Sequence, residues 1–142
     1  DLKDYLFMEL ILKEKDFRKA LKAHDWTQYE GKNLCVFCSA DAIIPTWAYM
    51  LVATYATPFA QSIVQANEGT FYKMHYHQVI QSLDTEEFRD KRVVIKGCSD
   101  KPVPASAYVD LTKILRPVAK TIMYGEPCST VPLYKKPRPS RK

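Results

Sequence analysis

Residues 33–49 read NLCVFCSADAIIPTWAY, and residues 92–108 read RVVIKGCSDKPVPASAY. In both stretches a short apolar, β-rich run leads to a Cys-Ser pair, and a proline farther on precedes an Ala-Tyr pair. Proline suits the first position of a helix, so each stretch predicts a strand, a short loop and a helix. The two stretches are therefore near-copies of one strand–loop–helix unit.

Patterns outside these stretches complete an alternating order of strands and helices. Residues 13–24 have the apolar spacing of an amphipathic helix, and residues 62–66 (SIVQA) predict a second, shorter strand. Further helices are expected over residues 45–58, 70–83 and 104–124, the last of them broken near Leu115 by Pro117. This order predicts an α/β fold, in which a small three-layer domain holds a short parallel sheet between flanking helices.

The order of strands within that sheet decides where the cysteines lie. We expect the strand that ends at Cys38 to be central, with the Ile63 strand on one side and the Val94 strand on the other. Cys38 and Cys98 would then lie at the same height on the carboxyl edge of the sheet. Open α/β sheets bind their ligands at this edge.

Three of the four cysteines, Cys38, Cys98 and Cys128, precede a serine and have a glycine or proline close by. Neighbouring strands are about 4.8 Å apart, so the loops that leave them can bring sulfur atoms together. Three thiolates suit zinc, iron or an iron–sulfur centre. The sequence therefore predicts a metal site with these three ligands. Candidates for a fourth ligand or an outer contact are Asp41, Asp100, Glu126, a water molecule or a partner's residue.

Two other interpretations of the cysteines stay open. One cysteine could be the nucleophile or persulfide carrier of a thiol enzyme that holds no metal, or all could be structural cysteines of an interaction module. Cys35 forms a C-x-x-C pair with Cys38, but residues three apart in a strand point to opposite faces. We therefore expect Cys35 to be a small core residue rather than a ligand.

Composition bounds the remaining possibilities. The chain has 142 residues, 46% hydrophobic and 26% charged, which predicts one globular domain over residues 1–134. Residues 135–142 hold five basic residues and form a tail expected to be solvated, whereas residues 1–134 have equal numbers of basic and acidic residues. Nucleic acid is therefore not an expected partner. No glycine-rich phosphate loop or nucleophile-elbow motif is present.

The expected location follows from the lack of long apolar runs and the low cysteine content. No run of apolar residues approaches the length of a membrane span, and four cysteines are too few for a disulfide scaffold. We expect a cytoplasmic protein with reduced thiols. The chain opens on Asp1 rather than Met, so we also expect a native N-terminal stretch to be missing.

Five longer phrases carry a resemblance to a known family: LILKEKDFR, HDWTQYEGK, CSADAIIPTWAYMLVA, RVVIKGCSDKPVP and MYGEPCSTVPLYKK. Together they resemble the bacterial family called domain of unknown function 2480 (DUF2480), over nearly the whole chain. Family members often have Gly where this chain has Ser99. The resemblance implies a bacterial, cytoplasmic protein whose gene often lies beside the sulfur-mobilisation genes of iron–sulfur assembly. It thereby implies a role as an accessory in iron–sulfur cluster assembly, with iron–sulfur assembly proteins as partners.

Overall fold

The structure is a computed structural model that describes residues 1–97, 100–126 and 128–138. The chain divides into two compact units, Asp1–Phe71 and Tyr72–Lys142, each with its own apolar core. The single domain expected over residues 1–134 stays a prediction. No helix among the described residues is long and apolar enough to cross a membrane.

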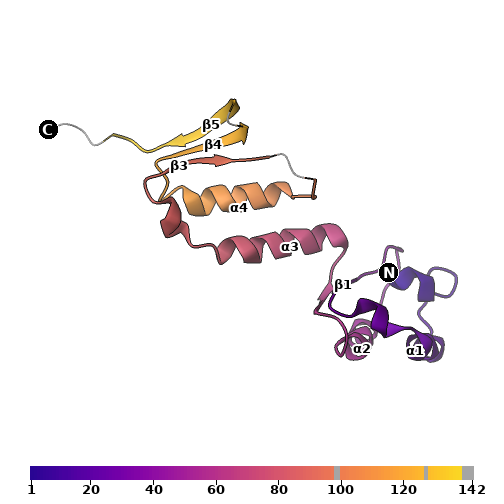
Figure 1. Cartoon of the computed structure of the whole chain (residues 1–142). Helices are drawn as coiled ribbons and strands as arrows, with labels where there is room; N and C mark the ends of the chain where they lie inside the picture. The colour runs from indigo at the N-terminus through magenta and orange to yellow at the C-terminus, as the bar shows by residue number, and fades with distance from the viewer. Residues whose placement is uncertain (98–99, 127, 139–142) are drawn as a thin grey trace. The chain divides into compact units, whose positions relative to one another are not determined.

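The first unit contains a parallel pair of strands and two α-helices (Figure 1). In β1–β2, Asn33 lies opposite Ser62 and Val36 opposite Gln65. The elements in chain order are η1 (Leu2–Tyr5), α1 (Glu14–Ala23), η2 (Trp26–Tyr29), β1 (Asn33–Val36), α2 (Thr46–Ala56) and β2 (Ser62–Gln65). The most buried side chains of its core include Phe17, Leu21, Ala48 and Ala56.

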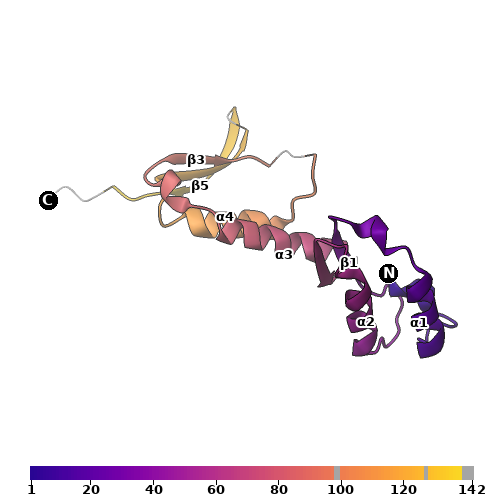
Figure 2. The ribbon, with the colours of Figure 1, turned by 60° about the horizontal axis from the view of Figure 1, so that its bottom comes forward.

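The second unit contains a mixed sheet with the strand order β3-β4-β5. β3 is parallel to β4, and β5 returns antiparallel to β4. α4 lies along one face of this sheet, as both views show (Figures 1 and 2). The elements from residue 68 onward are α3 (Glu68–Gln81), η3 (Thr85–Phe88), β3 (Arg92–Ile95), α4 (Ala105–Leu115), β4 (Thr121–Glu126) and β5 (Ser129–Lys135). The core between sheet and helix contains Ile95, Leu115, Ala119 and Ile122.

The α/β class predicted from the sequence is confirmed, but the predicted strand order is wrong. β1, the strand before Cys38, pairs with β2, whereas β3 pairs with β4 in a separate sheet. Each strand therefore pairs with the next strand along the chain, through a single-helix crossover. Such local pairing needs only a short connection, and sequential strands are neighbours in most folds. The prediction that β1 and β3 are neighbours is corrected accordingly.

The last predicted helix is also wrong in its second half. α4 ends at Leu115, two residues before Pro117, and residues 121–126 form β4 instead. Proline has no N–H for the helix and disfavours the helical conformation of the residue before it, which explains the stop. Thr121, Ile122 and Tyr124 are residue types that favour strands. This additional strand provides β3 with a neighbour of its own.

The two units repeat one another with a constant offset of 59 residues. The bounds of η2, β1 and α2 become those of η3, β3 and α4 when 59 is added, and β2 and β4 begin 59 residues apart. The strand registers correspond as well, since Asn33 opposite Ser62 matches Arg92 opposite Thr121. The near-copies seen in the sequence are thus part of a longer structural duplication.

Hydrogen bonds outside the regular elements follow the same offset. Gly31 N donates to Phe59 O at 3.1 Å, and Asp90 N donates to Val118 O at 2.9 Å. Gly31 and Asp90 both have positive φ, 67° and 56°. Asp25 and Asp84 each cap their short helix by accepting from the N–H two residues later. The duplication therefore extends to the turns.

Candidate functional site

The cysteines predicted as ligands are distributed over both units. Cys38 belongs to the first unit, Cys128 lies in the second between β4 and β5, and Cys98 lies outside the described residues. The thiols of Cys35, Cys38 and Cys128 are free. Among the described residues no group of three His, Cys, Asp or Glu side chains is arranged to hold a metal ion. The three-thiolate site stays a prediction.

Cys38 follows β1 and is half-buried against the core of the first unit. Its thiol donates weakly to the backbone carbonyl of Ala40, with an Sγ–O distance of 3.7 Å. Asp41, a candidate fourth ligand, is exposed in the loop that follows.

Cys35 does not belong to the core as predicted. The neighbours Leu34 and Val36 pack into the core of the first unit, so Cys35 between them lies on the other face of β1. It is half-buried there, and burial together with the nearby charge of Glu68 raises the pKa of its thiol. A raised pKa keeps Cys35 protonated at neutral pH, which disfavours a role as ligand or nucleophile.

The carboxyl ends of β3 and β4 bring two of the predicted ligand segments to one edge. Ile95 is paired with Tyr124, and the chain continues from these residues towards Cys98 and Cys128. Between the two segments, Lys96 Nζ lies 3.6 Å from Glu126 Oε2. These charged residues each stand two positions before a cysteine. The segments that carry Cys98 and Cys128 therefore leave the sheet side by side.

Two tyrosines support this edge from the α4 side. Tyr108 of α4 donates its hydroxyl to Gly97 O at 3.4 Å, and its ring meets the ring of Tyr124 edge-on at 5.8 Å. A Cβ on Gly97 would overlap the side chain of Tyr124. Glycine at position 97 is therefore required by the tyrosine beside it, a dependence that the sequence analysis missed.

The duplication corrects the predicted alignment of the cysteines. With the offset of 59 residues, Cys38 corresponds to Gly97 and not to Cys98. The residue facing this position also differs, since Gln65 corresponds to Tyr124. The repeated Cys-Ser phrase is therefore shifted by one residue between the units, and only the constant spacing of the prolines Pro45 and Pro104 could have revealed this.

The two remaining candidate ligands are carboxylates near the same edge. Glu126 is partly exposed and paired with Lys96, and Asp100 is exposed in the loop before α4. Carboxylate oxygens can complete a zinc or iron site that thiolates begin. Thiolates and carboxylates are thus available together at the β3–β4 edge.

A second group of polar residues, between α3 and α4, does not form a catalytic arrangement. His77 Nδ1 lies 2.9 Å from Asp110 Oδ2, which links the two helices. Ser106 lines the same hollow, but its hydroxyl is buried and has no hydrogen-bond partner among the described groups. A serine–histidine relay needs that hydrogen bond, so none forms here.

Comparison with known proteins identifies the family. The model of the family described as "Protein of unknown function (DUF2480)" matches residues 1–136. The chain belongs to this DUF2480 family. No curated protein and no solved structure matches it significantly. The resemblance found in the sequence is confirmed, and the match includes all the candidate ligands.

Proposed function

We propose that this DUF2480 protein is a cytoplasmic metal-binding protein that holds zinc or iron through thiolates at the β3–β4 edge. Cys98 and Cys128 are the first two ligands. Cys38, in the first unit, is the third thiolate predicted from the sequence. The role that fits such a site is that of an accessory in iron–sulfur cluster assembly, with assembly proteins as partners.

The observation that supports this proposal is the ion pair between Lys96 and Glu126, with its Nζ–Oε2 distance of 3.6 Å. It joins the ends of two parallel strands, and each cysteine follows its member of the pair by two residues. Thiolate pairs on adjacent turns are a common basis of zinc and iron–sulfur sites. Lys96 also favours negative charge nearby, as thiolate ligands require.

The test is metal analysis of untagged protein purified without oxygen, for the wild type and single Cys→Ser variants. We expect about one equivalent of zinc or iron, or several of iron for a cluster, in the wild type. Cys98→Ser, Cys128→Ser and Cys38→Ser should each lose most of it. Cys35→Ser is the matched control and should retain the metal, because Cys35 lies on the other face of β1.

Two results would contradict the proposal. One is wild-type protein without metal, and the other is equal metal content in all four variants. Circular dichroism spectra of each variant show whether a loss of metal follows from unfolding. Rapid alkylation of the exposed Cys128 in metal-free wild type would favour the thiol-enzyme interpretation instead.

A further inference from the structure

The face of the β3–β4–β5 sheet opposite α4 carries a row of polar side chains. Val93, Ile95 and Ile122 pack on the α4 side, so their strand neighbours project to the other side. Arg92, Thr121 and Lys135 are register partners across the three strands and form one row there. Thr121 therefore stands between two cationic side chains.

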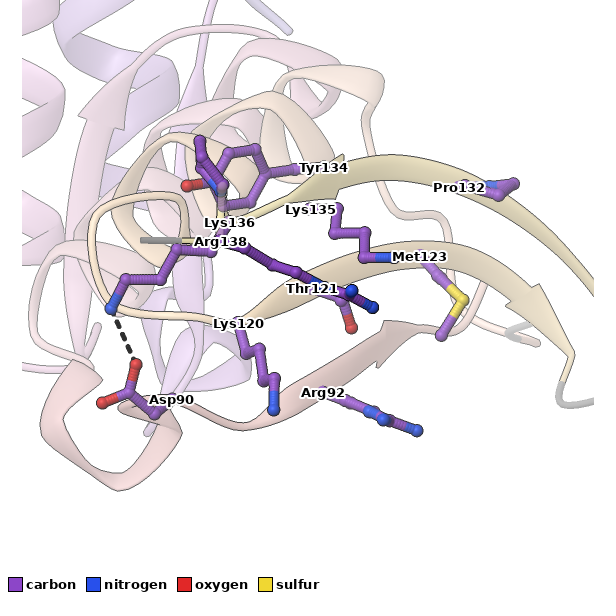
Figure 3. Close-up of a pocket in the computed structure, with 11 residues that line it drawn as sticks. Asp90, Arg92, Lys120, Thr121, Met123, Pro132, Tyr134, Lys135, Lys136 and Arg138 are labelled. Atoms are coloured by element: carbon purple, nitrogen blue, oxygen red, sulfur yellow. Dashed lines mark hydrogen bonds and ion pairs between the residues drawn. The ribbon is translucent and has the colours of Figure 1, made fainter. Parts of the chain in front are cut away.

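This row lies in an open groove of about 820 Å³. Figure 3 shows the basic side chains along this side of the strands. Met123 and Pro132 contribute apolar surface. The basic residues that line the groove are Arg92, Lys120, Lys135, Lys136 and Arg138. We call Arg92, Lys120, Lys135 and Arg138 the cationic face.

The charges of the cationic face are not neutralised by the protein around them. Asp90 is the acidic residue among those lining the groove, and it binds Lys136 at an Nζ–Oδ1 distance of 2.8 Å. This contact lowers the pKa of Asp90, so the carboxylate is already committed to one lysine. Within the described part of the chain, none of the four residues of the cationic face has a carboxylate within ion-pair distance.

Thr121 adds an unused hydrogen-bonding group in the middle of the row. Its hydroxyl oxygen is buried and has no partner among the described groups. A buried hydroxyl without a partner costs free energy that a bound ligand can recover. An anion held between Arg92 and Lys135 would be in position to accept a hydrogen bond from it.

The first unit shows that the fold itself does not need these charges. At the corresponding positions it has Asn33 for Arg92, Gln61 for Lys120 and Ser62 for Thr121. There Ser62 donates its hydroxyl to Asn33 Oδ1 at 2.7 Å, which satisfies the row without any charge. The cationic face is thus specific to the second unit, although both units share the same backbone pattern.

We propose that the cationic face binds the phosphate backbone of a nucleic acid. Its four cations come from separate segments along a groove, which suits a chain of phosphates better than a single anion. The ring of Tyr134 packs against Arg116, with the guanidinium 4.5 Å from the ring centre, on the α4 side of the sheet. No aromatic side chain on the described part of this face is therefore available to stack on bases, and binding is independent of base sequence.

The experiment measures binding of the full-length protein to a fluorescent single strand of about 20 nucleotides, by anisotropy at several salt concentrations. Four phosphate contacts predict a slope of log K against log salt of about −3. The variant Arg92→Asn/Lys120→Gln installs the residues of the first unit and should bind about tenfold more weakly near 50 mM salt, with a slope reduced by about 1.5. Arg92→Lys keeps the charge and should retain most of the affinity.

The matched control removes two positive charges from helices of the same unit. Lys73→Gln/Lys113→Gln should change the affinity much less than the groove variant, because both lysines are exposed on α3 and α4. Equal weakening by both double variants would show general attraction to positive charge and would overturn the proposal. So would absent binding at low salt, or complete displacement by inorganic phosphate at matched phosphate concentration, which would indicate a site for one phosphate.

Discussion

Gly97 and Tyr124 illustrate how one pair of residues separates the two repeats. In the second unit the Tyr124 side chain occupies the space that a Cβ at position 97 would need. In the first unit the corresponding pair is Cys38 and Gln65, where a side chain stands at the first position and a non-aromatic residue at the second. The pair therefore determines whether the strand end is followed by a thiol at once or one residue later.

Gly97→Ala tests this dependence. The added Cβ forces the Tyr124 ring away from Tyr108, and we expect a loss of about 1–3 kcal/mol in the free energy of unfolding. The double variant Gly97→Ala/Tyr124→Gln uses the side chain found in the first unit and should recover part of that loss. Urea unfolding curves of both single variants and the double variant give the coupling energy. Additive losses would mean that Tyr124 does not restrict position 97.

At the scale of elements, the sequence predicted well where local signals agree and poorly where they compete. The strands at residues 33–36 and 92–95 and the helices after Pro45 and Pro104 were predicted because apolar runs, loops and prolines all indicate the same elements. β4 was missed because its apolar residues also fit a continued helix, and only Pro117 separates the two interpretations. The partner of each strand could not be predicted, since pairing depends on tertiary contacts.

The last strand changes what is expected of the basic tail. Lys135 ends β5 opposite Thr121, and Lys136 N donates to Lys120 O at 2.8 Å, so both residues that were assigned to the tail belong to the sheet edge. Deleting residues 135–142 should therefore lower the melting temperature by about 3–5 °C, the effect of about 1 kcal/mol in a chain of this size. Deleting residues 137–142 should leave it nearly unchanged.

Calorimetry of the two truncated chains distinguishes these cases. The shorter deletion is the control, because residues 137–142 lie beyond β5 and beyond the Lys136 contact. Equal melting temperatures for both truncations and the full chain would show that the edge contacts of Lys135 and Lys136 contribute no stability.

At the scale of the whole molecule, averages over the chain concealed the distribution of charge. Residues 1–71 hold seven basic and nine acidic residues, whereas residues 72–142 hold 14 basic and seven acidic residues. The neutral average of residues 1–134 therefore combines a slightly acidic unit with a basic one. The boundary near residue 71 was not visible in the sequence, because it falls inside the continuous helix α3.

The same boundary explains why the candidate metal site was only partly predictable. Cysteine spacing indicated thiols at strand ends, and the β3–β4 edge places two of the predicted ligand segments side by side. The third cysteine follows a strand of the other unit, because β1 pairs with β2 rather than with β3. Spacing alone contains no information on that choice, which depends on which strand each crossover returns to.

X-ray absorption at the metal edge of wild-type protein, purified without oxygen, tests the central claim most directly. Thiolate ligation predicts a first shell dominated by sulfur at about 2.3 Å, and Cys128→Ser should lower the sulfur count by about one. The Cys35→Ser spectrum should match that of the wild type. A first shell made only of nitrogen and oxygen, or protein that contains no zinc or iron to measure, would contradict a thiolate metal site in this protein.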